Sequence, residues 1–255
     1  MALNPPFTSF AGRRVWIAGA STGIGKALAL ALVERGARVA VSARSAAGLE
    51  QAFSDRALLL PCDVTDAAAV QRVADSLKSQ WGGLDLVVAM AGTYAQMRAG
   101  EFNLDEARRI VEVNLDGVLN LFAAVRPHLM DQRSGHFAIV ASVAGYGGLP
   151  NSMAYGASKA ACINLAQSMW MDLRDHGIGV TVINPGFVRT PLVAANRFPM
   201  PFIIEPPEAA EAILAGLARG DFEIHFPRVF TRLLKLLNLL PHRLYLPLVK
   251  RLTRQ

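Results

Sequence analysis

Cysteine is scarce in this 255-residue chain, and its two copies form no recognisable site. Cys62 and Cys162 are far apart in the sequence, with no Cys-x-x-Cys pair and no Cys/His cluster beside either. We therefore expect two buried, reduced thiols, with neither a disulfide nor a metal site. A chain of this length can bury a substantial core without such cross-links.

Long hydrophobic runs are also missing. The first ten residues contain no basic stretch and no long apolar run, so no secretory signal is predicted. The longest stretch without charge, Ser134–Ser158, is interrupted by glycines, a proline and several polar residues, which makes it a poor membrane span. These features favour a cytoplasmic protein.

Acidic residues are absent from the segment Arg228–Gln255, which carries seven Lys or Arg residues. The formal net charge of the whole chain is +6, so subtracting those seven leaves −1 on the preceding residues. A body that is close to neutral gives little support for a nucleic-acid partner.

Near its start the chain has an apolar run, a glycine-rich turn and a helical pattern in succession. The run Val15–Ala18 is followed by Gly19, Gly23 and Gly25, and then by the apolar-periodic segment Ala27–Val33. Glycines allow a sharp turn and a close backbone approach to a ligand, and a helix N-terminus favours a bound phosphate. This order is typical of a dinucleotide-binding turn. The alternative is a turn that serves only tight strand–helix packing.

Similar apolar runs alternate with helical patterns along the rest of the chain. This alternation predicts an α/β fold, a single-domain, Rossmann-like, doubly wound parallel sheet of about seven strands. We assign residues 1–227 to this domain and 228–255 to a C-terminal extension. The expected strands are Val15–Ala18, Arg38–Ser42, Ala57–Pro61, Leu84–Ala89, His136–Ala141, Gly179–Asn184 and Phe222–Phe226. The expected helices are Lys26–Arg35, Ala46–Phe53, Ala67–Gln80, Leu104–Met130, Ala154–His176 and Pro207–Ala218.

The end of the second expected strand bears on the choice of cofactor. In such folds an acidic residue there binds the ribose 2′-hydroxyl of NAD, whereas an arginine accommodates the 2′-phosphate of NADP. This chain has Arg44 there, and no acid before Glu50. Because Arg44 could form a charge-assisted pair with the phosphate, NADP is favoured. The alternative is an ordinary surface arginine.

A second motif lies in the later half of the chain. Tyr155-Gly-Ala-Ser-Lys159 opens a helical pattern, and Ser142 lies thirteen positions upstream. With the Gly-x-x-x-Gly-x-Gly turn, this set resembles the short-chain dehydrogenase/reductase family over roughly residues 13–226. One departure is Ala89-Met90-Ala91-Gly92, where the family commonly has Asn-Asn-Ala-Gly, and the missing amides leave cofactor affinity open. The supporting positions are Asp63, Ala91, Gly92, Asn114, Pro185 and Gly186.

The motif also makes chemical sense from its residues. Tyr155 and Lys159, four positions apart, share one face of a helix. We expect the ammonium to lower the tyrosine pKa from about 10 toward neutrality, so that the phenol can exchange a proton while nicotinamide transfers hydride. Ser142 ends an apolar strand at the edge where such sheets bind ligands, and its hydroxyl could hold the substrate oxygen.

The resemblance implies further roles. It places Asn114 in a proton relay behind Lys159, Lys159 on the nicotinamide ribose and Asp63 at the adenine ring. Taken singly, Tyr155 could instead be a helix-face aromatic, Asn114 a buried amide and Asp63 a turn residue. The implied catalytic set is Asn114, Ser142, Tyr155 and Lys159, and the implied cofactor-binding set is Gly19, Ser21, Thr22, Gly23, Ile24, Gly25, Arg44, Asp63, Val64, Ala91, Gly92, Lys159, Pro185, Gly186, Val188 and Thr190.

The sequence therefore predicts an NADP(H)-dependent oxidoreductase that interconverts a carbonyl and a secondary alcohol, chiefly in the direction of reduction. The segment Thr190–Pro207 is rich in Pro, Phe and aliphatic residues, which favours a hydrophobic or lipid-like ketone or aldehyde. We expect Tyr146, Leu149 and Met153 to line the same pocket. By resemblance the protein is expected to be a homodimer or homotetramer. The alternative is a catalytically idle NADP-binding regulatory or scaffold protein.

The segment Arg228–Gln255 is expected to form two basic amphipathic helices. Arg228, Arg232 and Lys235 fall on one face of the first, with leucines on the other. Its thirteen residues before Pro241 rise only about 20 Å, too little to cross a bilayer. They could make peripheral contact with an anionic membrane surface. Alternatively, the leucines pack on the body or on a partner subunit while the basic face stays in solvent.

Overall fold

The computed structural model describes residues 2–194, 196 and 199–253. Arg254, which contributes to the basic extension, lies outside the described residues, as do residues 195, 197 and 198 of the apolar segment Thr190–Pro207.

A seven-stranded, entirely parallel sheet organises the chain, as the alternating pattern predicted. Its strand order is β3-β2-β1-β4-β5-β6-β7, and the order reverses between β1 and β4. In the central register Ile17 pairs with Val41 on one side and with Val88 on the other. The strands are β1 (Arg14–Ala18), β2 (Arg38–Ser42), β3 (Leu58–Leu59), β4 (Leu86–Ala89), β5 (Gly135–Val140), β6 (Ile178–Pro185) and β7 (Glu223–Phe226).

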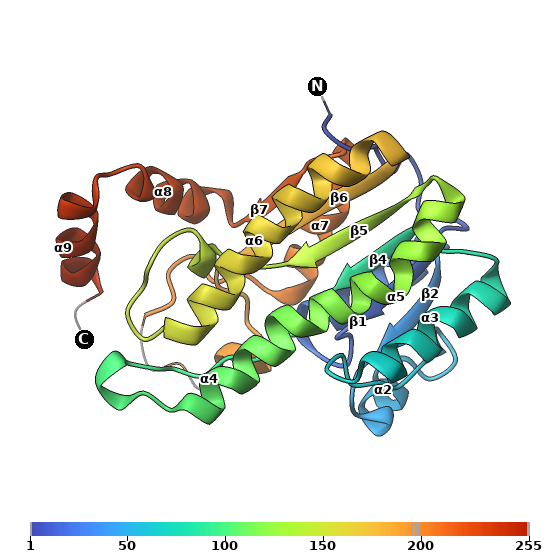
Figure 1. Ribbon diagram of the computed structural model, residues 1–255, viewed down its shortest axis with the longest axis horizontal. Helices are drawn as coiled ribbons and strands as arrows, with labels where there is room; N and C mark the ends of the chain where they lie inside the picture. Colours follow the sequence, from blue (N-terminus) through green and yellow to red (C-terminus); the bar gives the residue numbers. More distant parts are fainter. Residues whose placement is uncertain (1, 195, 197–198, 254–255) are drawn as a thin grey trace.

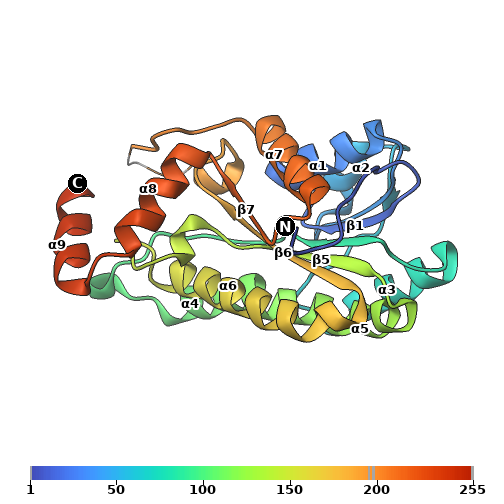
Figure 2. The same ribbon diagram turned by 90° about the horizontal axis from the view of Figure 1, so that it is seen from above.

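Helices cover both faces of the sheet, and each face has its own hydrophobic core (Figures 1 and 2). Large apolar strand residues such as Trp16, Ile17 and Phe137 are completely buried between these layers. One face carries α1 (Gly23–Glu34), α2 (Ala46–Phe53) and α7 (Pro206–Arg219), and the other carries α3 (Ala67–Trp81), α4 (Leu104–Val111), α5 (Gly117–Gln132) and α6 (Met153–Leu173). Short 3₁₀ turns lie between some of these elements, at η1 (Ala99–Glu101), η3 (Val143–Gly145), η4 (Arg174–His176) and η5 (Pro191–Val193).

Two elements differ from the sequence-based prediction by more than a shift of one or two residues at an end. The helix expected over Leu104–Met130 is not continuous, because a π-helical turn, η2 (Glu112–Asp116), separates α4 from α5. Such turns are rare, often lie at functional sites, and have no simple periodicity by which a sequence could reveal them. The strand expected over Ala57–Pro61 pairs only at Leu58 and Leu59, as an edge of the sheet.

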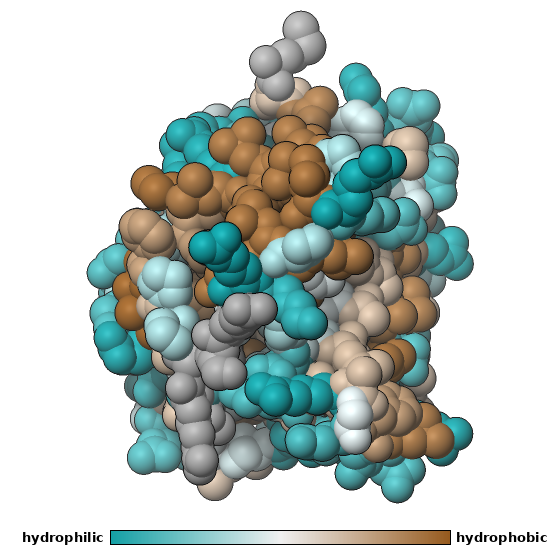
Figure 3. All heavy atoms as spheres, turned by 90° about the vertical axis from the view of Figure 1, so that its left-hand side faces the viewer, coloured by the Kyte–Doolittle hydropathy of each residue, from teal (hydrophilic) through white to brown (hydrophobic). Residues whose placement is uncertain are grey.

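The C-terminal extension forms α8 (Arg228–Asn238) and α9 (His242–Leu252), which lie together at one end of the molecule (Figure 1). Thr231 and Tyr245 are buried against the body, and Lys235 forms an ion pair with Glu223 of β7. Leu234, Leu237 and Leu240 are partly buried, as expected if the leucines pack inward, whereas the other leucines of this face are exposed. Figure 3 shows this end as an apolar area bordered by hydrophilic side chains. The exposed apolar residues of the extension are Val229, Leu233, Leu236, Leu239, Leu244, Leu246 and Leu252.

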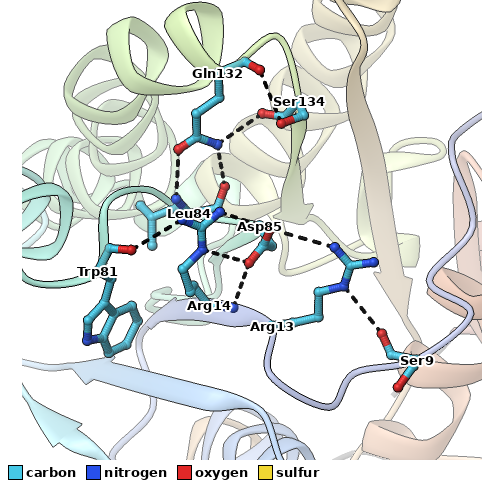
Figure 4. Close-up of polar contacts among 8 residues, drawn as sticks. All are labelled: Ser9, Arg13, Arg14, Trp81, Leu84, Asp85, Gln132 and Ser134. Atoms are coloured by element: carbon cyan, nitrogen blue, oxygen red, sulfur yellow. Dashed lines mark hydrogen bonds and ion pairs between the residues drawn. The ribbon is translucent and has the colours of Figure 1, made fainter.

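An ion pair joins β1 to the loop before β4, at the edge of the sheet where these two strands begin (Figure 4). Arg14 donates to both carboxylate oxygens of Asp85, with Nε–Oδ2 2.9 Å and Nη2–Oδ1 3.1 Å, and its backbone N–H also donates to Asp85. Gln132 of α5 bonds the backbone of the adjacent Leu84 through both ends of its amide. These contacts fix where β4 begins, two residues later than the expected Leu84.

Burial would raise the pKa of Asp85, but the hydrogen bonds from Arg14 outweigh burial and hold that pKa below its ordinary value. A carboxyl group with a lowered native pKa stabilises the fold above its unfolded pKa of about 3.9, and this contribution is lost as the pH falls through the native value.

We predict that Asp85→Asn lowers the free energy of unfolding by about 1–3 kcal/mol at pH 7, because Arg14 loses its charged acceptor. Urea denaturation at several pH values should show the difference from wild type shrinking below about pH 4, where Asp85 itself becomes protonated. A difference that stays constant between neutral and strongly acidic pH would contradict this account of the ion pair.

Candidate active site

A cleft of about 900 Å³ opens at the edge of the sheet where the strands end. Ligands bind at this edge of open α/β sheets, next to the point where the strand order reverses. Every residue of the expected cofactor-binding set lines the cleft, and so do Ser142, Tyr155 and Lys159. The fold therefore brings together residues that are more than 170 positions apart in the sequence, such as Gly19 and Thr190.

The glycine turn between β1 and α1 is packed too closely to admit side chains. Gly19 has a positive φ of 102°, and a Cβ on it would overlap the backbone of Ala91. A Cβ on Gly25 would overlap the carbonyl oxygen of Gly19. Thr22, the residue before α1, makes no side-chain capping bond, so the first N–H groups of α1 face the cleft without that partner. The turn thus has the features of an anion site at a helix N-terminus.

Two charged residues border the same cleft from neighbouring strand ends. Arg44, which follows β2, is exposed and forms no hydrogen bond or ion pair with any described residue. Its guanidinium is therefore available to a ligand. Asp63 has one carboxylate oxygen engaged by the N–H and hydroxyl of Thr65, at 3.0 and 2.9 Å. Asp63 is therefore partly a turn residue, the alternative considered from the sequence, although it also lines the cleft.

Tyr155 and Lys159 lie one turn apart on α6 and face the cleft together. The Lys159 Nζ lies 5.8 Å from the centre of the Tyr155 ring and donates to the carbonyl of Val140, at the end of β5, over 2.8 Å. Ser142, two residues further on, is buried, and its hydroxyl accepts from the Ala144 N–H at 3.1 Å. The three side chains therefore come from one helix and one strand end.

Ionisation in this site departs from the expectation that Lys159 would lower the pKa of Tyr155. Burial raises the pKa of Tyr155 to about 12, and its hydrogen bond with Ser142 offsets only part of that shift. Burial also lowers the pKa of Lys159. The structure therefore presents a neutral phenol at working pH. The sequence shows the spacing of these residues but not how deeply the protein encloses them.

Asn114 lies in the π-helical turn η2 and is completely buried. Its amide accepts from the Thr93 N–H at 2.8 Å, and it donates to the Thr93 carbonyl at 3.0 Å and to the Ser158 hydroxyl at 3.1 Å. Asn114 is not among the residues that line the cleft. Its side chain instead ties the loop after β4 to α6, beside Lys159.

Several lining residues were not found from the sequence. Tyr94 packs edge-on against Tyr155, with ring centroids 4.9 Å apart, and Arg109 of α4 reaches the cleft beside it. Tyr94 follows the Ala91-Gly92 pair by two residues, and this position could have marked it, whereas nothing in the sequence marks Arg109. Leu192 and Val193, by contrast, belong to the segment Thr190–Pro207 that the sequence marked, and they add apolar surface to the cleft.

Tyr146, Leu149 and Met153 do not line this cleft, contrary to expectation. The Tyr146 hydroxyl donates to Glu223 at 2.6 Å, and Met153 is 43% exposed. Glu223 also accepts from Asn184 and Lys235, so its carboxylate joins β6, β7 and α8. Tyr146 thus helps to hold the extension in place.

Comparison with known proteins agrees with the fold and the motifs. Residues 13–199 match the family model described as short chain dehydrogenase. An uncharacterized oxidoreductase of Myxococcus xanthus (strain DK1622) is 38% identical over 247 residues, covering 94% of this chain and 97% of its own. An uncharacterized oxidoreductase of Staphylococcus aureus (strain USA300) is 33% identical over 207 residues, covering 80% of this chain and 90% of its own. The chain belongs to the short-chain dehydrogenase/reductase family and is an oxidoreductase.

Solved structures show the same fold. A short-chain dehydrogenase from Streptomyces avermitilis has a TM-score of 0.81 at 26% identity and covers 95% of this chain and 98% of its own. A short-chain dehydrogenase/reductase from Burkholderia phymatum, solved in complex with NAD, has a TM-score of 0.82 at 22% identity over 89% of this chain and 93% of its own. At that identity the second structure supports the fold alone.

Proposed function

We propose that the protein is an NADP(H)-dependent enzyme that interconverts a carbonyl and a secondary alcohol, working mainly as a reductase. The observation that carries this proposal is the convergence of Tyr155, Lys159 and Ser142 on a cleft that also contains the glycine turn. A protein that only bound the nucleotide would need the glycine turn and Arg44, but not the other three side chains.

The residues present fit a nicotinamide dinucleotide. The backbone contacts at Gly19 and Gly25 leave no room for a Cβ, and the N-terminus of α1 faces the same space. When bound, the cofactor supplies or accepts the hydride. We propose that the expected cofactor-binding set holds it, with the glycine turn and helix N-terminus against its phosphates. We retain Asp63 at the adenine ring and Lys159 on the nicotinamide ribose as parts of the proposal.

The preference for NADP rests on Arg44. Its guanidinium lacks a partner among the described residues and stands where a 2′-phosphate would be recognised. Because phosphate carries charge and arginine presents a planar fork of donors, their pairing is directional as well as electrostatic. The related Burkholderia protein was solved with NAD, so cofactor choice has to be established on this chain itself.

In the direction of reduction, Tyr155 acts as the proton donor. Its raised pKa keeps the phenol protonated at neutral pH, which is the state that a general acid requires. Ser142 donates a hydrogen bond to the substrate oxygen as negative charge develops there. Lys159 orients the phenol from one turn away.

Asn114 acts as a positioning residue in this scheme. Its amide fixes Thr93 on one side and Ser158 on the other, and so fixes the loop after β4 and the turn of α6 that carries Lys159. We also propose that Asn114 takes part in a proton relay behind Lys159, as the family resemblance implies.

The substrate is proposed to be a hydrophobic ketone, which gives a secondary alcohol, or an aldehyde, which gives the corresponding primary alcohol. Tyr94 packs against Tyr155, and Leu192 and Val193 add aliphatic surface to the same cleft. A panel of ketones, aldehydes, 3-oxoacyl thioesters and steroids, followed by the loss of NADPH absorbance, tests the activity and the substrate class together. If no carbonyl compound is reduced while NADPH still binds, the idle nucleotide-binding alternative is favoured.

We predict that Tyr155→Phe lowers turnover at least about 100-fold, because the general acid is removed while the shape of the cleft is kept. NADPH binding, measured by fluorescence titration, should be largely unchanged. Tyr146→Phe serves as the matched control, since that phenol bonds Glu223 outside the cleft, and this variant should keep most of the activity. A near-native rate in Tyr155→Phe would remove Tyr155 from the acid/base role.

We predict that Arg44→Asp weakens NADPH binding about tenfold or more, because a charge-assisted bond is replaced by repulsion. NADH binding should change much less, since NADH lacks the 2′-phosphate. Arg72→Asp, an exposed site on α3, controls for the change in net charge. Equal losses for the two cofactors would overturn the proposed preference.

A further inference from the structure

The C-terminal helices concentrate exposed apolar surface at one end of the molecule. Among the described residues, seven of the fifteen exposed large apolar side chains belong to α8, α9 and the turn between them. Val229 is 60% exposed, Leu236 62% and Leu239 80%. Patches of this kind usually mark a binding surface rather than a free surface of a monomer. Figure 3, which faces this end of the molecule, shows an apolar area bordered by hydrophilic side chains.

Basic side chains lie beside this apolar surface. At 3.6 residues per turn, Val229, Leu233 and Leu236 form one stripe along α8, and Arg228 and Arg232 form the adjacent stripe. Both stripes are exposed. Thr231 lies on the side of α8 opposite the leucine stripe, where it is buried and bonded to His225 at 2.6 Å, and the Lys235–Glu223 ion pair holds the edge of the helix next to Arg228. The body contacts therefore hold the leucine and arginine stripes outward.

The charge of this surface is of one sign. The segment Arg228–Gln255 contains no acidic residue. Lys235 is paired with Glu223, but the other basic residues of α8 and α9 form no ion pair within the described part of the chain. These unpaired cations are Arg228, Arg232, Arg243, Lys250 and Arg251.

The positive charge favours an anionic lipid surface over a second copy of this chain as the binding partner of these helices. A symmetric contact with a second copy would bring the same surface together from both chains, and their arginines would meet without a carboxylate between them. An anionic lipid surface satisfies both stripes, because leucines enter the boundary between headgroups and acyl chains while arginines contact the headgroups. Each helix has eleven residues, about 16 Å, and none of the described helices is long and apolar enough to cross a membrane.

We propose that α8 docks on an anionic lipid surface through the outward stripe of Val229, Leu233 and Leu236 and the adjacent stripe of Arg228 and Arg232, with α9 supplying further cations. The docking depends only on these two helices and not on the catalytic proposal.

The docking surface lies on the same side of the molecule as the cleft, and what this means for the substrate rests on the proposed function. The arrow of β5 in Figure 1 points to the side of the molecule that carries α8 and α9, and the cleft lies at that edge of the sheet. Phe230 of α8 lies against Phe202, with ring centroids 6.2 Å apart, in the segment that leads on from Leu192 and Val193 of the cleft. Docking would hold the cleft close to a lipid surface, where a hydrophobic carbonyl compound concentrates.

The test is co-sedimentation of the full chain with vesicles of phosphatidylcholine containing about 30% phosphatidylserine, with pure phosphatidylcholine vesicles as reference. We expect binding to the anionic vesicles, weaker binding in high salt and little binding to the neutral ones. Leu233→Ser with Leu236→Ser should reduce the bound fraction at equal lipid at least about tenfold, since two of the inserted side chains are lost. Arg228→Gln with Arg232→Gln should weaken binding to anionic vesicles specifically.

Matched controls lie elsewhere on the surface. Leu3→Ser, a leucine that is 51% exposed near the N-terminus, and Arg72→Gln on α3 should bind as wild type does. Tyr155→Phe should also bind normally, which separates a failure of docking from a failure of the catalytic proposal. Circular dichroism establishes that each variant is folded.

Wild-type protein that stays in the supernatant with anionic vesicles would overturn the proposal, and so would equal binding by the leucine and arginine variants. Light scattering after gel filtration tests the other possible occupant, a second copy of this chain, by measuring the mass of each variant in solution. If the leucine variant loses a dimer and no form binds vesicles, the face is a contact between copies of this chain and the lipid proposal is wrong.

Discussion

An ammonium group buried at the carboxyl edge of the sheet sets the conditions for the rest of the site. Lys159 is only 4% exposed and donates to the last carbonyl of β5. A buried charge is costly unless its surroundings supply hydrogen-bond acceptors. The end of β5 and helix α6 must therefore stay in the relative position that keeps Lys159 bonded to the Val140 carbonyl. Tyr155, one turn away on α6, takes its orientation from the same helix, and Asn114 holds the turn of α6 next to it through Ser158.

Local spacing and the positions of the strand ends were enough to predict the main features of the fold and that the glycine turn, Ser142, Tyr155 and Lys159 share one cleft. The Tyr155–Lys159 spacing fixes a shared helix face whatever surrounds it, and a parallel sheet gathers Gly19, Arg44 and Asp63 at one edge because all its strands end there. The inferences from spacing and strand ends need only periodicity and topology, whereas the place of Asp63 in the cofactor-binding set was implied by the family resemblance. The family membership found by comparison agrees with them.

Features that depend on tertiary contacts were not predicted. The outward turn of the α8 leucines follows from contacts made by Thr231 and Lys235 with β7 and the residues beside it, which no helical wheel reveals. The π-helical turn around Asn114 interrupts a pattern that is periodic on both sides. The pKa of Tyr155 likewise depends on how closely neighbours such as Tyr94 and Ser142 enclose the phenol, so enclosure outweighed the effect expected of the nearby ammonium.

The claim at the centre of this account is that Tyr155 is a neutral phenol, ready to donate a proton. Its ionisation can be followed without any substrate, as the difference in tyrosinate ultraviolet absorbance between wild type and Tyr155→Phe in the protein without added cofactor. The account predicts no tyrosinate from Tyr155 up to about pH 10, the ordinary tyrosine pKa. One tyrosinate that appears with a midpoint between about pH 7 and 8 and is lost in the variant would contradict it.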